Sequence, residues 1–111
     1  MGMPKPSEEF SKQALTKEVR QLLLREVPVA SEEGPDWEAL HSLLRQWVTE
    51  QLEYDPSRLR LVLYRVDVDE SRAAEALSLG DTKAIADALA SLILERQAAK
   101  ARWRIWYRNR K

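Results

Sequence analysis

The sequence predicts an all-α protein, a single compact domain of about five helices that ends in a long C-terminal helix. Two observations lead to this fold class. Apolar residues recur three or four positions apart through most of the chain, which is the period of an amphipathic helix. No two segments show a convincing alternation of apolar and polar residues from which a sheet could be built. A length of 111 residues fits one domain with one modest core.

The first helix is expected within residues 11–27, "SKQALTKEVRQLLLREV". Its apolar face consists of Leu15, Val19, Leu22 and Leu23. Pro28 ends this helix, because proline lacks the backbone N–H that a helix interior uses. The residues that can cap or staple its start are Ser7, Ser11 and Phe10. Residues 27–35 contain two prolines and a glycine and are expected to form a loop, and residues 1–10 are expected to be flexible.

Asp36 is expected to cap a second helix that closes near Tyr54. The apolar face of this helix consists of Trp37, Leu40, Leu44, Trp47 and Val48. Asp55 and Pro56 mark the end of this helix and the start of the next, since aspartate favours the cap and proline the first helical position. Residues 58–66 fit the spacing of a helix and also that of a strand. We favour a helix, because a lone strand would have no partner.

Asp67 or Asp69 is expected to cap a short fourth helix, "ESRAAEALS", and Gly80 suits the left-handed conformation that follows many helices. Asp81 opens the last helix, which is expected to continue to the C-terminus. About 28 residues at about 1.5 Å each make a helix of about 42 Å. A compact domain of this size is about 35 Å across. The last helix therefore either spans the domain or overhangs it.

A net charge of zero conceals two blocks of opposite charge. Residues 26–55 contain one arginine and eight acidic residues, a charge of −7. Residues 96–111 contain seven basic residues and no acidic one, a charge of +7. The match suggests that the acidic block faces the basic end of the chain, either within one molecule or between two.

His41 is the only histidine, and the chain has no cysteine to act as a nucleophile. On one helix, Glu38 lies three residues before His41 and Arg45 four residues after it. A carboxylate can orient an imidazole for general acid–base catalysis, but such a pair on a helix surface is commonplace. We therefore expect no enzyme, no catalytic residue and no small-molecule substrate.

The acidic segment "DVDES", residues 67–71, invites comparison with a calcium-binding loop. An EF-hand loop that began at Asp67 would need glycine at its sixth position and glutamate at its twelfth, where this chain has Arg72 and Ser78. The three glycines are far apart, so no phosphate-binding loop is present. We expect neither a metal nor a cofactor. Without a long apolar stretch, a secretory signal or cysteine, a cytoplasmic protein is expected.

Two segments carry a resemblance to a known group of proteins. "LVLYRVDVDE", residues 61–70, and "ADALASLILERQAAK", residues 86–100, resemble a Leu-Tyr-Arg-Ile/Val-Asp-Val segment and a Glu-Arg-Gln-x-x-Lys helix of small uncharacterised bacterial helical proteins. The similarity covers roughly residues 36–104. It implies a helical fold and carries no activity with it.

The chain ends in "ARWRIWYRNRK", residues 101–111, which combine arginines with aromatic residues. On a helical wheel the three aromatic residues fall on the same side as Ile85, Leu89 and Leu92, so the wheel predicts that they continue a stripe facing the core. Four contacts are open to this segment. It can pack on its own domain opposite the acidic block, on a second copy or another protein, on nucleic acid, or on an anionic membrane.

We expect a non-enzymatic protein–protein interaction or self-association module that uses the end of the last helix. The expected partner-binding residues are Trp103, Trp106 and Tyr107 as apolar anchors, with Arg104, Arg108 and Arg110 for charge pairing. The alternative is an accessory RNA-binding or DNA-binding protein that uses the same segment. An isoelectric point near 6.6 argues against that alternative, and a membrane surface is the least favoured contact.

Overall fold

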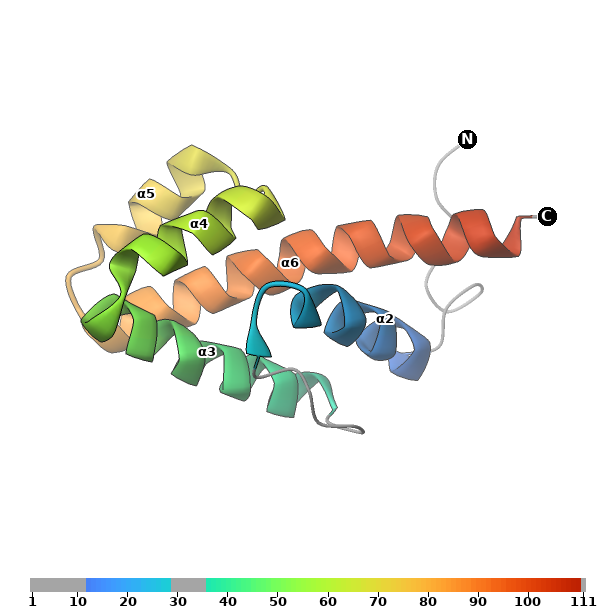
Figure 1. Ribbon diagram of the computed structural model, residues 1–111, viewed down its shortest axis with the longest axis horizontal. Helices are drawn as coiled ribbons and strands as arrows, with labels where there is room; N and C mark the ends of the chain where they lie inside the picture. Colours follow the sequence, from blue (N-terminus) through green and yellow to red (C-terminus); the bar gives the residue numbers. More distant parts are fainter. Residues whose placement is uncertain (1–11, 29–35, 111) are drawn as a thin grey trace.

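The computed structural model describes residues 12–28 and 36–110, and these form five α-helices (Figure 1). In chain order the helices are α2 (Lys12–Leu24), α3 (Trp37–Tyr54), α4 (Pro56–Val66), α5 (Glu70–Leu77) and α6 (Thr82–Asn109). The predicted all-α fold class and the long C-terminal helix are confirmed. The predicted caps Ser7 and Ser11, the staple Phe10 and the flexible segment 1–10 lie outside the described residues, as does most of the loop predicted at 27–35.

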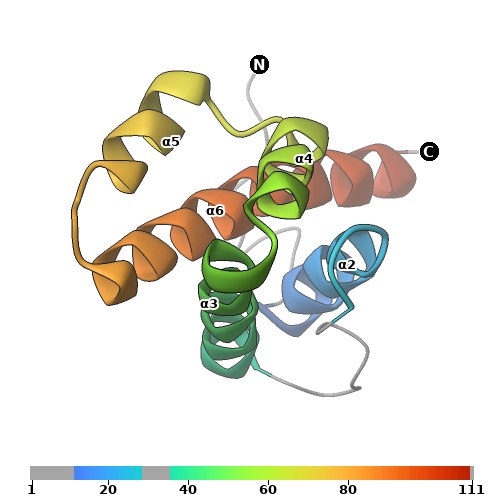
Figure 2. The same ribbon diagram turned by 60° about the vertical axis from the view of Figure 1, so that its left-hand side comes forward.

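The 28 residues of α6 extend along the longest axis of the molecule, whose dimensions are 45 × 30 × 20 Å (Figure 1). Helices α2 and α3 pack on one side of α6, and α4 and α5 lie on the other side (Figures 1 and 2). On that second side, α4 and α5 cover the N-terminal part of α6 and stop short of its C-terminal part. The longest helix is therefore covered unevenly.

Four aspartates begin the four helices from α3 to α6. In each case the side chain accepts a hydrogen bond from the backbone N–H three residues later, which satisfies one of the free donors at a helix N-terminus. These capping residues are Asp36, Asp55, Asp69 and Asp81. Asp67, the other candidate cap for α5, instead ends α4 in the left-handed conformation, with φ of 71°. Gly80 is also left-handed, with φ of 87°, and it lies two residues after Ser78, the C-cap of α5.

Residues 58–66, for which the sequence left helix and strand open, belong to helix α4. One face of this helix is buried in the core through Leu59, Val62, Leu63 and Val66. The preference for a helix is confirmed, since the Asp55 cap and Pro56 at the first helical position both favour it.

The core lies between α6 and the helices around it. Its largest fully buried side chains include Leu23, Leu40, Leu44, Leu89 and Ile93. On α6 the positions buried against neighbouring helices also include four alanines, Ala86, Ala90, Ala98 and Ala101. Small side chains allow helix axes to approach closely, because the distance between packed helices depends on the residues at the contact.

Gln97 is a polar residue inside this core. It is only 3% exposed, and its side-chain oxygen Oε1 has no hydrogen-bond partner. Burying an unsatisfied acceptor costs about 1–3 kcal/mol, because the group loses its hydrogen bonds to water. Gln97 therefore weakens the fold at the middle of α6.

Replacing Gln97 with methionine should raise the free energy of unfolding by about 1 kcal/mol, because an unbranched apolar side chain of similar length removes the unsatisfied acceptor. Urea denaturation followed by circular dichroism would measure the change. Gln46 is exposed on α3 and provides the matched control, since Gln46→Met should change stability by less than about 0.5 kcal/mol. A loss of stability in Gln97→Met would contradict this account of the buried amide.

Candidate functional site

An apolar stripe runs along the side of α6 that faces α5. Ile85 and Leu92 on this stripe are half-buried and pack against the core. Further along, Leu92 and Ala99 line a shallow hollow together with the turn between α4 and α5. Because α5 has only eight residues, its cover ends near this point. The stripe then continues with Trp103, Trp106 and Tyr107, which we call the aromatic cluster.

The aromatic cluster is largely outside the core, so the prediction that it continues the core-facing stripe is wrong. Trp103 is 46% exposed and Tyr107 is 59% exposed, and Trp106 is half-buried. In this part of α6 the core-facing positions are Ala101 and Ile105. The buried side of α6 combines the alanines with Leu89, Ile93, Leu94 and Ile105, and it lies beside the stripe on which the aromatic residues fall.

The three rings of the aromatic cluster hold one another in place. The ring centroids of Trp103 and Trp106 are 5.4 Å apart, and those of Trp106 and Tyr107 are 5.1 Å apart, both in edge-to-face arrangements. The centroids of Trp103 and Tyr107 are 5.7 Å apart. The guanidinium carbon of Arg110 lies 4.9 Å from the ring centre of Trp106, within the range of a cation–π interaction. The cluster is thus a continuous apolar surface with a cation at its edge.

Two of the predicted partner-binding arginines contact a carboxylate of their own chain. Glu18 on α2 is 5% exposed. Its Oε1 atom accepts a hydrogen bond from Arg108 Nη2 at 3.0 Å, and its Oε2 atom lies 3.2 Å from Arg104 Nε. The two arginines are four residues apart on α6, so both reach the same side of the helix. This arrangement holds α2 against the C-terminal part of α6.

Three further basic residues in the C-terminal half of α6 also contact the rest of the fold. Arg96 forms an ion pair with Asp67 at 3.2 Å. Lys100 donates a hydrogen bond to the carbonyl oxygen of Val66 at 2.8 Å, and the pKa of Lys100 is lowered, mainly by burial and next by the charge of Arg96. Arg102 is half-buried and lines a hollow between α3 and α6. Much of the basic charge near the C-terminus is therefore already in contact with the rest of the protein.

Only part of the acidic block can be followed in the fold, because Glu32 and Glu33 lie outside the described residues, and within that part the charge of Glu26 acts on Lys100 of the basic end. Among the described residues, no ion pair joins residues 26–55 to residues 96–110. Glu26 of the acidic block pairs instead with Arg65 on α4, at 3.0 Å. The carboxylate that pairs with Arg104 and Arg108 is that of Glu18 on α2, which lies outside both charged blocks. The exposed acidic residues of α3 include Glu38, Glu50 and Glu53.

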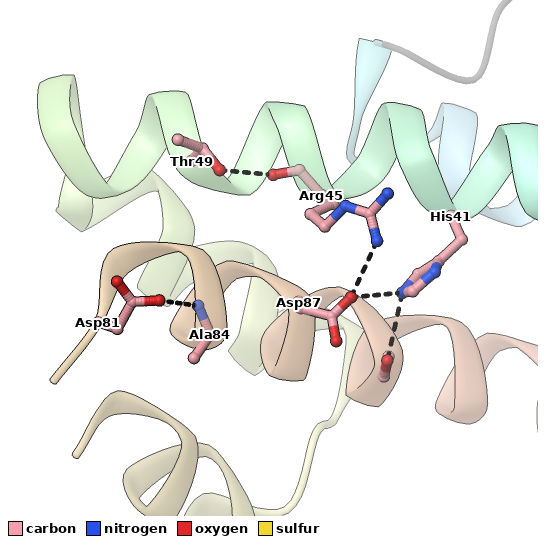
Figure 3. Close-up of polar contacts among 7 residues, drawn as sticks. His41, Arg45, Thr49, Asp81, Ala84 and Asp87 are labelled. Carbon is pink, nitrogen blue, oxygen red and sulfur yellow. Dashed lines mark hydrogen bonds and ion pairs between the residues drawn. The ribbon is translucent and has the colours of Figure 1, made fainter. Parts of the chain in front are cut away.

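Figure 3 shows a polar cluster between α3 and α6 in which Asp87 contacts both His41 and Arg45. His41 Nε2 lies 3.7 Å from Asp87 Oδ1 and 3.2 Å from Ser91 Oγ. Both contacts use the same ring nitrogen, whereas a Ser-His-Asp triad requires the serine and the aspartate at opposite nitrogens. The carboxylate beside the imidazole is Asp87 rather than the Glu38 that the sequence suggested. This cluster is suited to joining two helices.

The remaining acidic segment serves the fold as well. Asp69 caps α5, and the hydrogen bond from the backbone N–H of Arg72 lowers the pKa of its carboxyl group. Within residues 12–28 and 36–110, no group of three or more histidine, aspartate or glutamate side chains is placed to hold a metal ion. In the same part of the chain, no helix is long and apolar enough to cross a membrane.

Glu18 is the residue of this region that sequence reasoning missed. It lies three residues after Leu15 and four before Leu22, so it shares their apolar face. A carboxylate in the middle of an apolar helix face needs a cation or hydrogen-bond donors when that face is buried. Arg104 and Arg108, spaced to reach one point, could supply them. The sequence thus contains both the misplaced carboxylate and the two arginines that can neutralise it. Only the tertiary structure shows that they meet.

Replacing both Arg104 and Arg108 with alanine should lower the free energy of unfolding by about 3 kcal/mol, because it leaves the Glu18 carboxylate buried without a cation. Replacing Glu18 with leucine should change it by less than about 1 kcal/mol, since the arginine side chains, 41% and 58% exposed, can turn toward water. Urea denaturation of the three proteins would check this asymmetry. If Glu18→Leu were as damaging as the double arginine variant, the ion pairs would have a different role.

Comparisons with models of protein families, with curated proteins and with solved structures find no significant match to this chain. The resemblance of residues 36–104 to small bacterial helical proteins stays a prediction. The function must therefore be inferred from the site itself.

Proposed function

We propose that this protein is a non-enzymatic protein–protein interaction module whose contact surface is the aromatic cluster at the end of α6, with Arg110 at its edge. The observation that carries the proposal is the exposure of these rings. Trp103 and Tyr107 are about half exposed although they pack against each other and against Trp106. Covering the exposed parts of two such rings removes on the order of 200 Å² from water, or about 5 kcal/mol before the costs of association.

The residue types and the contacts among the three rings support contact with another protein. Tryptophan, tyrosine and arginine are the residues most often found at the energetic centres of protein interfaces. Because each ring of the cluster already contacts both others, little side-chain freedom is lost when a partner covers them. Arg104 and Arg108 remain part of the proposed contact surface, and they also join α6 to α2 through Glu18.

Two features disfavour nucleic acid as the partner. Arg96, Arg104 and Arg108 are neutralised by carboxylates of the same chain, so fewer cations are available for phosphates. The rings also pack edge-to-face on one another, which shields faces on which bases would stack. The expected cytoplasmic location and the absence of an enzymatic activity stay predictions of the same proposal.

Capture of binding proteins from a cell extract would test the proposal, with wild-type protein compared with the double variant Trp103→Ala/Tyr107→Ala. A specific protein should be retained by the wild type and lost with the double variant. Tyr54→Ala is the matched control, because Tyr54 is 78% exposed at the far end of α3. Retention should survive nuclease treatment and change little between about 50 mM and about 200 mM salt.

The opposite pattern would contradict the proposal. Material that disappears with nuclease, and whose retention falls steeply over the same salt range, would identify nucleic acid as the partner. Equal retention by wild type and Trp103→Ala/Tyr107→Ala would exclude the aromatic cluster as the contact surface.

A further inference from the structure

The uneven cover of α6 leaves a step in the molecular surface. Helices α4 and α5 project from one side of α6 over its N-terminal part, and no other described helix covers the C-terminal part of that side (Figure 1). The view in Figure 2 shows the same two helices raised above α6, opposite α2 and α3. The aromatic cluster continues the α5-facing stripe of α6 and therefore lies on the bare side of the step.

A groove between α4 and α5 lies on the raised part of the step. Its volume is about 680 Å³, and it is open to solvent, so side chains of a partner can reach it. The apolar residues that line it are Leu63, Tyr64, Val68, Ala73, Ala74 and Leu77. Leu63 and Ala73 are buried, whereas Tyr64 is 80% exposed and Leu77 is 43% exposed. The groove thus presents an apolar surface of its own.

The charge at the groove is opposite to that at the end of α6. Three carboxylates, those of Asp67, Asp69 and Glu70, line the groove with one guanidinium, that of Arg60. Asp67 and Asp69 are engaged with Arg96 and with the start of α5, and Glu70 is exposed at the rim. The aromatic cluster carries Arg110 on the ring of Trp106. With one guanidinium among three carboxylates, the groove keeps a net negative charge, which complements Arg110 beside the aromatic cluster.

We propose that the partner of the aromatic cluster is a second copy of this chain, whose groove between α4 and α5 receives it. This inference rests on the proposed function above and names the partner. Because the cluster and the groove lie on the same side of α6, a two-fold rotation places each cluster in the other copy's groove. Helices α4 and α5 of one molecule then cover the C-terminal part of α6 in the other. The contact between cluster and groove is made twice, so the dimer buries twice the area of one such contact. Stable interfaces bury roughly 1,200–2,000 Å² in total.

Molar mass measured by light scattering over a range of concentrations tests this pairing. Wild-type protein should form a dimer, and Leu77→Lys should weaken dimerisation at least about tenfold, because it places a cation where Arg110 arrives. Leu79→Lys is the matched control, since Leu79 is 54% exposed two residues further along and does not line the groove. Circular dichroism would establish that each variant keeps the helical fold. Equal weakening by both lysine variants would overturn the proposal.

Mixing two variants separates this arrangement from a pairing of one aromatic cluster with the other. Trp103→Ala/Tyr107→Ala lacks the cluster and keeps the groove, whereas Leu77→Lys has a damaged groove and keeps the cluster. Each should be monomeric alone, and their mixture should form a heterodimer through the one intact contact. A mixture that stays monomeric, or a Leu77→Lys protein that dimerises as well as the wild type, would overturn the proposal.

The experiments distinguish a failure of the proposed self-association from a failure of the proposed interaction function. A wild-type chain that remains monomeric at all concentrations would exclude the second copy as partner. If such a monomer still captured another protein through Trp103 and Tyr107, the aromatic cluster would remain an interaction surface with a different occupant. If it captured none, both proposals would fall.

Discussion

The length of α6 is the constraint on which the rest of the structure depends. A helix of 28 residues is about 42 Å long and spans a molecule whose longest dimension is 45 Å. The helices packed around it have between 8 and 18 residues, so no single one can cover it. Cover must be assembled from several pieces, and one side of the C-terminal part is left without any among the described residues. The exposed aromatic surface follows from this mismatch of lengths.

The buried carboxylate of Glu18 decides how the end of α6 is used. An ionised side chain that is 5% exposed requires compensation, and Arg104 and Arg108 provide it from an adjacent helix. In this part of α6, Ile105 is buried, whereas Trp103 and Tyr107 are exposed. The pairing with Glu18 also neutralises two cations that could otherwise bind the phosphates of a nucleic acid. One internal ion-pair arrangement thus sets both the geometry and the electrostatics of the surface.

Several features that suggest chemistry in the sequence have structural roles in the fold. Asp69 begins a helix, Asp67 ends one and pairs with Arg96, and His41 joins α3 to α6 through Asp87 and Ser91. The cluster around His41 lacks the arrangement that would let a carboxylate and a hydroxyl act through opposite ring nitrogens. The exposed part of the aromatic cluster has no such structural role among the described residues, and for that reason it carries the functional proposal.

The sequence by itself determined the helices, because their signals are local: periodic apolar residues, aspartate caps and the Asp55-Pro56 start. It also identified Trp103, Trp106 and Tyr107 as one stripe, since spacing on a helix fixes which side chains share a side. Only the tertiary structure decided whether that stripe is buried, because burial depends on the length and position of helices elsewhere in the chain. The pairing of Arg104 and Arg108 with Glu18, about 90 residues away in sequence, was likewise decided by packing, since charge counts along a chain do not specify which groups meet.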